Sequence, residues 1–250
     1  MPVIAASSTR LPQVLSACLF SGTLIAWPWI WSGPAHAAGG LFDPPLAVET
    51  VPAGSDPTGQ RRCTRYSDMT VLETGTDSPA PGAAAVVAAG QPCRPGPPGI
   101  ALSTAHFAFR GRKGPFLLFE AADPNGAVPF LVVQIGTGRV IYRDSWTARG
   151  ELAGAVLTDA GLRLQYRRAI NSPCSLAQDG ASCWVSLARA GLIPSVVARS
   201  PTPACAAAYH TIRAPAANLS IVSYDVEIAL SLQGRANVLS RGAPACEPAP

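Results

Sequence analysis

The sequence is poor in charged residues. Only 14% of its 250 residues are Asp, Glu, Lys or Arg, and Lys113 is the single lysine. A coiled coil or long-helix protein would be rich in Glu, Lys and Leu. A charged disordered chain would contain far fewer than the 48% hydrophobic residues found here. The composition excludes both classes and favours one globular domain, or a domain with irregular segments.

The basic residues are nearly all arginines, and bases exceed acids by four, 19 against 15. A nucleic-acid-binding domain shows a stronger excess with interleaved aromatic residues, so no nucleic-acid partner is expected. Because Arg, Ala, Gly and Pro have GC-rich codons, we attribute the composition to a bacterial genome. We expect the arginine clusters to be solvated ends of loops and strands, and contact with an anionic glycan or lipid headgroup is the alternative. These clusters are Arg61, Arg62 and Arg65; Arg110, Arg112 and Lys113; and Arg163, Arg167 and Arg168.

The N-terminal part has the features of an export signal. Arg10 is its only charge, residues 11–31 are uncharged, and residues 35–37 (AHA) have the small-x-small pattern of a signal-peptidase site. We predict a signal peptide over residues 1–37 and a mature chain that begins at Ala38. This prediction places the protein in the periplasm or outside the cell.

Two alternatives remain open for this segment. Residues 11–31 are long enough to span a bilayer, so the signal could stay as an uncleaved membrane anchor. Residues 15–18 (LSAC) have the form of a lipobox, which would make Cys18 a lipid attachment site. Beyond residue 37 no apolar run is long enough to cross a membrane, so no transmembrane segment is expected after cleavage.

The cysteine count agrees with export. Removal of Cys18 with the signal leaves six cysteines, and an even number in an exported chain indicates disulfides. Six cysteines allow 15 pairings, and the sequence does not decide among them. We choose the pairing of sequence neighbours, and the loop-entropy model gives each bridge about 2.5 to 4 kcal/mol. The sequence has no CxxC motif and only two histidines after residue 37, so neither a metal site nor a cofactor is expected. The predicted disulfides are Cys63–Cys93, Cys174–Cys183 and Cys205–Cys246.

The rest of the chain divides into two parts. Residues 38–99 are rich in Pro, Ala and Gly and predict an irregular lead-in, which holds the first disulfide loop and a short strand at residues 69–72. Residues 100–250 predict an antiparallel β domain. Within it, residues 184–187 are expected to form a strand and residues 192–217 to be largely irregular.

The β domain is predicted from short apolar segments separated by turns, without helical periodicity of useful length. We expect an antiparallel β-sandwich, or a partly open barrel, with irregular Pro/Ala/Gly-rich segments and disulfides. Residues 100–110 alternate in polarity and predict one strand. Ile221–Leu232 is the clearest strand, with one apolar and one polar face. Its predicted buried face contains Val222, Tyr224, Val226, Ile228, Leu230 and Leu232, and its wet face contains Asp225 and Glu227.

The residues available for catalysis are few. Ser103-Thr104-Ala105-His106 superficially resembles the histidine segment of trypsin-like proteases, but no Gly-Asp-Ser-Gly segment follows it. We expect His106 to be a packed or edge residue of a strand. Glycoside hydrolysis needs two carboxylates across a cleft. Asp225 and Glu227 are the candidate pair, and the acids that could join them are Glu120, Asp123, Asp144 and Glu151.

We therefore predict an exported periplasmic or secreted module that binds without catalysis and associates with an envelope component. The alternative is a secreted hydrolase that uses the carboxylates on the sheet face. A concave pocket with two or more carboxylates would favour the hydrolase. A flat or aromatic-lined sheet face would favour the binding module.

Overall fold

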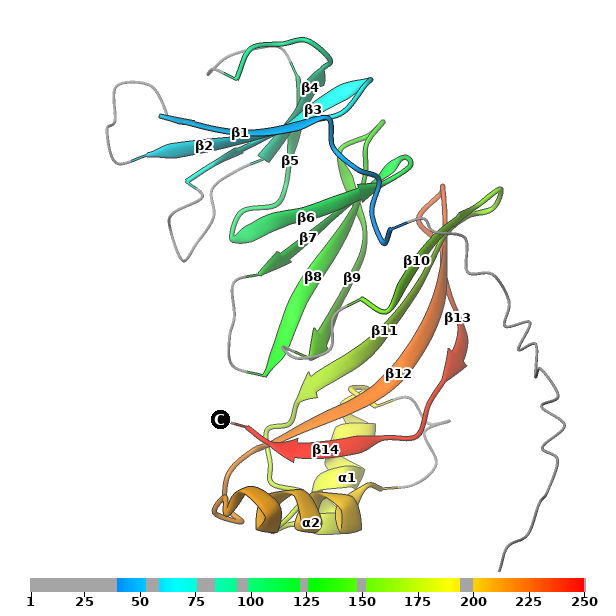
Figure 1. Ribbon diagram of the computed structural model, residues 1–250. Helices are drawn as coiled ribbons and strands as arrows, with labels where there is room; N and C mark the ends of the chain where they lie inside the picture. Colours follow the sequence, from blue (N-terminus) through cyan, green and yellow to red (C-terminus); the bar gives the residue numbers. More distant parts are fainter. Residues whose placement is uncertain are drawn as a thin grey trace, which may run out of the picture. The chain divides into compact units, whose positions relative to one another are not determined.

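The computed structural model describes residues 40–52, 59–75, 84–93, 99–121, 126–147, 152–193 and 200–249. Ala38–Pro250 forms one compact unit that is mostly antiparallel β-sheet, with two short helices (Figure 1). This confirms the predicted fold class: the arrangement is sandwich-like, and the described strands do not close into a barrel. The predicted signal peptide, the anchor and the lipid site at Cys18 lie outside the described residues.

The strands form two sheets. The first has the order β1 (Ala47–Pro52), β2 (Gln60–Arg65), β3 (Met69–Thr74), β4 (Ala84–Ala88) and β5 (Gly99–Leu102). The second runs β13 (Ala236–Arg241), β12 (Ser220–Ser231), β11 (Gly161–Asn171), β9 (Arg139–Thr147), β8 (Ala127–Gln134), β7 (Phe116–Ala121) and β6 (Phe107–Lys113). Outside that path, β10 (Gly154–Thr158) pairs with β11, and β14 (Ala245–Pro248) pairs with β12.

The meander β6–β9 is the middle of three layers, and its central strands are buried on both faces. Such strands carry continuous apolar runs rather than alternating ones, as residues 116–119 (FLLF) and 130–133 (FLVV) do. One face packs against the five-stranded sheet through Leu117, Phe119, Leu131 and Val133. The other packs against β11 and β12 through Phe116, Leu118, Phe130 and Val132.

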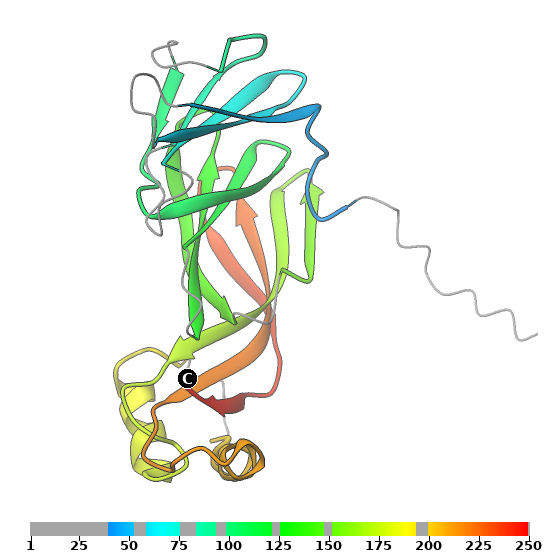
Figure 2. The ribbon, with the colours of Figure 1, turned by 60° about the vertical axis from the view of Figure 1, so that its left-hand side comes forward.

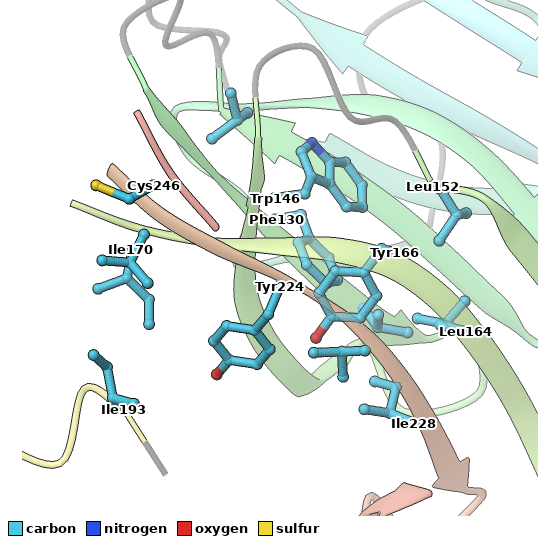
Figure 3. Packing of buried hydrophobic residues seen from close by; sticks show 14 of the residues in the cluster. Phe130, Trp146, Leu152, Leu164, Tyr166, Ile170, Ile193, Tyr224, Ile228 and Cys246 are labelled. Atoms are coloured by element: carbon cyan, nitrogen blue, oxygen red, sulfur yellow. The ribbon is translucent and has the colours of Figure 1, made fainter. Parts of the chain in front are cut away.

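The larger core lies between the middle layer and β11–β12, and an aromatic group is at its centre (Figure 3). The rings of Phe130 and Trp146 stack with centroids 4.1 Å apart, and Tyr166 meets Phe130 edge-on at 5.1 Å. Tyr224 and Ile228 of β12 are both fully buried in the same core. Their burial confirms the inward face predicted for Ile221–Leu232, except that Leu232 lies beyond the end of β12 and is exposed.

The second sheet has a weak junction between β9 and β11, which share a single register pair, Trp146 and Arg168. Side chains complete the connection there. Ser145 Oγ donates to the Ala169 carbonyl at 2.5 Å, and the Asn171 side chain accepts the Ala127 N–H at 3.1 Å. The two halves of the sheet are thus connected mostly by side chains rather than by a continuous ladder.

Two helices cover one end of the larger core (Figure 2). They are α1 (Gly180–Arg189) and α2 (Thr202–Ile212), and each buries a cysteine and a residue four positions later, the i, i+4 spacing of one helix face. Cys183 and Leu187 are buried in α1, and Cys205 and Tyr209 in α2. Residues 184–187 therefore lie in a helix and do not form the predicted strand. Residues 202–212, within the segment expected to be largely irregular, form α2.

The short strand predicted at residues 69–72 is confirmed as part of β3. The prediction that the rest of residues 38–99 is irregular is wrong in the described part, because these residues also form β1, β2, β4 and the first residue of β5. The buried residues of β2 are Arg61, Cys63 and Thr64. Because Arg61 and Thr64 are polar, the sequence of β2 shows no alternation of apolar residues. The alanine-rich β4 is a strand because it pairs with β3 along its whole length. This tertiary context overrides the weak local preference.

The single strand predicted over residues 100–110 is two strands. β5 ends at Leu102 and β6 begins at Phe107, and His106 lies in the turn between them with a φ of 70°. Its side chain is exposed, so the expectation of a strand histidine is wrong.

All three predicted disulfides are present: Cys63–Cys93, Cys174–Cys183 and Cys205–Cys246. Disulfides persist in oxidising environments, so they indicate that the chain folds in one. No helix within the described ranges is long and apolar enough to span a bilayer.

Candidate functional site

The outer face of β11 and β12 is the candidate site, because alternation directs polar side chains to it. The inward residues of both strands fill the larger core, while Arg163, Gln165 and Arg167 of β11 point the other way, in register with Ala229, Glu227 and Asp225 of β12. A hollow of about 450 Å³ lies on this face. It is lined by Gln165, Arg167, Asp225, Glu227, Ser240 and Arg241, with backbone from neighbouring residues.

Both carboxylates in the hollow are held by arginines of the neighbouring strand. Arg167 Nη1 donates to Asp225 Oδ1 at 3.2 Å, and Arg163 Nε lies 3.5 Å from Glu227 Oε1. The Asp225 side chain is 73% exposed. A glycosidase needs one carboxyl group kept protonated by an apolar setting. Asp225, exposed beside a guanidinium, has no such setting. The Glu227 side chain is 22% exposed, so its case depends on the arginine beside it alone.

Two polar groups of the hollow have no partner among the described residues. The Gln165 side-chain amide forms no hydrogen bond there, and Arg241 forms no ion pair. Ser240 Oγ contacts Glu227 only weakly, at 3.5 Å. The lining contains two arginines and two acids, so its formal charges balance. Arg163, which pairs with Glu227 without lining the hollow, adds one positive charge nearby. No exposed aromatic ring lines the hollow. By the criterion set out from the sequence, a hollow with two carboxylates favours the hydrolase, and only the pairing of both carboxylates with arginines argues against it.

The structure brings only part of the predicted set together. Asp225 and Glu227 share the hollow, whereas His106 is in the turn between β5 and β6 and does not line it. Glu120 is in β7 and pairs with Arg110 at 3.4 Å. Asp123 and Glu151 lie outside the described residues.

Asp144, the remaining predicted acid, belongs to a different cluster. Its side chain is only 4% exposed, and Arg168 Nε lies 2.8 Å from its Oδ1 at an angle unsuited to a hydrogen bond, so that contact is electrostatic. Tyr142 donates to Oδ2 at 2.8 Å, and Tyr166 donates to the same oxygen. Arg168 also donates to the Tyr224 hydroxyl at 3.1 Å. We call this group the Asp144 cluster.

Burial governs the acid–base chemistry of the Asp144 cluster. Desolvation raises the pKa of Tyr142, Tyr166 and Tyr224, and the neighbouring Asp144 carboxylate raises the first two further. The phenols therefore stay neutral and act as hydrogen-bond donors. The cluster connects β9 to β11 and β12 at their weak junction, a structural role that uses every member.

Arg168 links the Asp144 cluster to a second hollow, of about 310 Å³, beside the β9–β11 junction. The lining is otherwise mostly small or apolar, and Arg168 is its one charged residue. Because the guanidinium is already held by Asp144 and Tyr224, this hollow has little free polar chemistry.

Sequence reasoning named Asp144 only as an extra carboxylate and missed its tyrosines. One signal was available: Tyr142 and Asp144, like Tyr166 and Arg168, are two apart on their strands and so share a face. Which face is buried depends on the packing of layers far apart in the chain. In the described ranges no three His, Cys, Asp or Glu side chains gather in a metal-binding group.

Comparison with family models, curated proteins and solved structures finds no match for this chain. The argument about function therefore depends on the geometry of the site.

Proposed function

We propose that this chain is an exported, non-catalytic binding module of the cell envelope, and that the outer face of β11–β13 holds its ligand. One observation carries the proposal: a hollow of about 450 Å³ on a polar sheet face, in which both carboxylates are already paired with arginines. The two arginine–carboxylate pairs hold their polar groups in position for ligand recognition. They also leave neither carboxylate free to act as a general acid.

The ligand that suits this face is an anionic glycan. Arg241, which forms no ion pair among the described residues, can hold a carboxylate or sulfate group in bidentate fashion. Arg167 can add its Nη2 group, because its Nε and Nη1 already donate to Ser223 and Asp225. The amide of Gln165 and the hydroxyl of Ser240 can meet sugar hydroxyls. The disulfides and the predicted signal peptide support an extracytoplasmic site of action.

Binding to a polyuronate tests the proposal, with neutral dextran as the comparison polymer at equal ionic strength. We expect the protein to bind alginate and not dextran. The double variant Arg163→Gln/Arg167→Gln should weaken alginate binding about tenfold. The matched double variant Arg139→Gln/Arg143→Gln on β9 should leave it unchanged. Equal losses from both pairs, or no binding, would reject the proposal.

A secreted hydrolase is the second candidate, because Asp225 and Glu227 line the same hollow. Release of reducing ends from alginate would favour it. That release should then disappear in Asp225→Asn/Glu227→Gln. On the binding proposal no reducing ends appear with either protein.

A further inference from the structure

We propose that the free edge of β13 is a docking surface for an extended segment of another protein, added as a further strand of the sheet. This surface is the edge of β13 rather than its face; it shares Arg241 with the proposed glycan site and goes beyond the proposed function. An unpaired strand edge presents backbone N–H and C=O groups that a partner strand can satisfy.

β13 is the terminal strand of the second sheet, and among the described strands it pairs only with β12. Arg235 O accepts from Ser231 N, and Gly242 N donates to Asp225 O, so these flanking groups point toward β12. Because direction alternates along a strand, Ala236 and Arg241 direct their N–H and C=O groups outward. All six residues of β13 are exposed.

Of the other edges of the second sheet, β10 also pairs only with β11 among the described strands and exposes Val156 and Leu157, although no arginine pair flanks them. The edges at β6 and β14 are charged or covered. At the opposite end, β6 carries Arg110, Arg112 and Lys113. Asp43 also covers this edge: its N–H donates to the Arg112 carbonyl at 2.8 Å, and its Oδ2 accepts from the Gly114 N–H at 2.7 Å. β14 continues the β13 edge but packs against α2 and is tied to it by Cys205–Cys246. These are the protections that natural proteins use against strand addition.

β13 instead presents two consecutive apolar side chains at its centre. A bulge inserts Leu239, which has no register partner in β12, beside Val238. Leu239 is 48% exposed and Val238 is 42% exposed. Arg235 and Arg241, six residues apart, flank them and form no ion pair within the described chain. The complementary partner is an extended segment with an apolar centre and an acid near each end.

The probe for this surface is the synthetic peptide Glu-Thr-Val-Thr-Val-Thr-Glu, capped at both ends, added to the full disulfide-bonded protein. Amide hydrogen exchange measured residue by residue should slow at least tenfold at Ala236 and Arg241 and stay unchanged in β1. The same peptide with lysine in place of both glutamates should bind at least tenfold more weakly. Leu239→Lys should abolish the protection, while Val48→Lys should preserve it, because Val48 is also 48% exposed on an edge strand.

Three outcomes would overturn the proposal. These are unchanged exchange in β13, equal binding of the two peptides, and protection of the same amides that grows with protein concentration alone. The last would assign the edge to a second copy of this chain. The peptide test is independent of the alginate test, because Arg163→Gln/Arg167→Gln leaves β13 intact and should not change peptide binding.

Discussion

Arg167 and Arg168 are neighbours in β11, and each is paired with an aspartate, but they lie on opposite faces of the strand. Arg167 meets Asp225, which is 73% exposed, on the outer face. Arg168 meets Asp144, which is 4% exposed, on the inner face. The same pair of residue types therefore has two roles. The inner pair connects layers of the fold, and the outer pair lines the hollow proposed to hold a ligand.

Burial explains the difference in energy. An exposed ion pair contributes about 0 to 1 kcal/mol, because water and salt screen it. Removing one partner of a buried pair costs about 3 to 5 kcal/mol, because the other partner is left uncompensated. The two faces of β11 should thus separate in stability measurements even though their chemistry is alike.

The largest expected effect is at the inner face. Asp144→Ala should lower the free energy of unfolding by about 3 to 5 kcal/mol, because Arg168 and two tyrosine hydroxyls lose their acceptor. Chemical denaturation measures the loss. A loss below about 1 kcal/mol would show that the Asp144 cluster does not connect the layers.

The next largest loss of stability is expected for an apolar residue of the larger core. Ile228→Ala should cost about 2 to 4 kcal/mol, because Ile228 is fully buried in the larger core and the truncation leaves a cavity. Its neighbour Glu227 points outward, so Glu227→Gln is the matched control, with an expected change below about 0.5 kcal/mol. Equal denaturation midpoints for the two variants would contradict the assignment of faces.

The Cys174–Cys183 disulfide, which includes a buried residue of α1, should contribute somewhat less to stability. Replacing Cys174 and Cys183 together by serine removes a bridge between residues nine apart in sequence, which costs about 2 to 3 kcal/mol in the loop-entropy model. Thermal unfolding under non-reducing conditions measures it. Peptide mapping without reduction should recover the Cys174–Cys183 link, and free thiols at both positions would refute the bridge.

Glu73 sharpens the comparison, because it is buried like Asp144 but has no ion-pair partner within 4 Å among the described residues. Its Oε1 accepts the Phe109 N–H at 2.6 Å, its Oε2 has no partner there, and burial raises the pKa of the carboxyl group. Compared with the unfolded state, the native state therefore favours the protonated form of Glu73. Stability relative to Glu73→Gln should be highest below about pH 4.5 and should fall as pH rises through the raised pKa. A flat difference across denaturation curves at pH 4 to 8 would contradict this.

The smallest effect is expected at the outer face. Asp225→Asn should change the free energy of unfolding by less than about 0.5 kcal/mol, because Asp225 is exposed and its ion pair is screened. A stabilised variant would instead indicate strained, clustered carboxylates and would favour the hydrolase.

The sequence was sufficient to predict features set by local alternation. The two faces of Ile221–Leu232 followed from apolar residues at every second position. The disulfide pairing was a choice among 15 possibilities, and the structure confirms that choice. The five-stranded sheet could not be predicted in the same way. Its strand β2 buries Arg61 and Thr64, and β4 is alanine-rich, so both depend on pairing partners rather than on their own pattern.

The candidate site, too, could be predicted from the sequence only in part. Asp225 and Glu227 were predicted on the wet face, and the structure places both there. Their arginine partners, and the inward position of Asp144, depend on the register of β11 with β12 and on the junction with β9. Register between strands more than fifty residues apart in the chain is not encoded in either strand alone.

Two double-mutant cycles, measured side by side by chemical denaturation, test the central comparison most directly. One uses Asp144→Ala with Arg168→Ala, and the other uses Asp225→Ala with Arg167→Ala. We predict a coupling energy above about 2 kcal/mol for the inner pair and below about 0.5 kcal/mol for the outer pair. Equal coupling energies for the two pairs would contradict the assignment of a structural inner face and a free outer face.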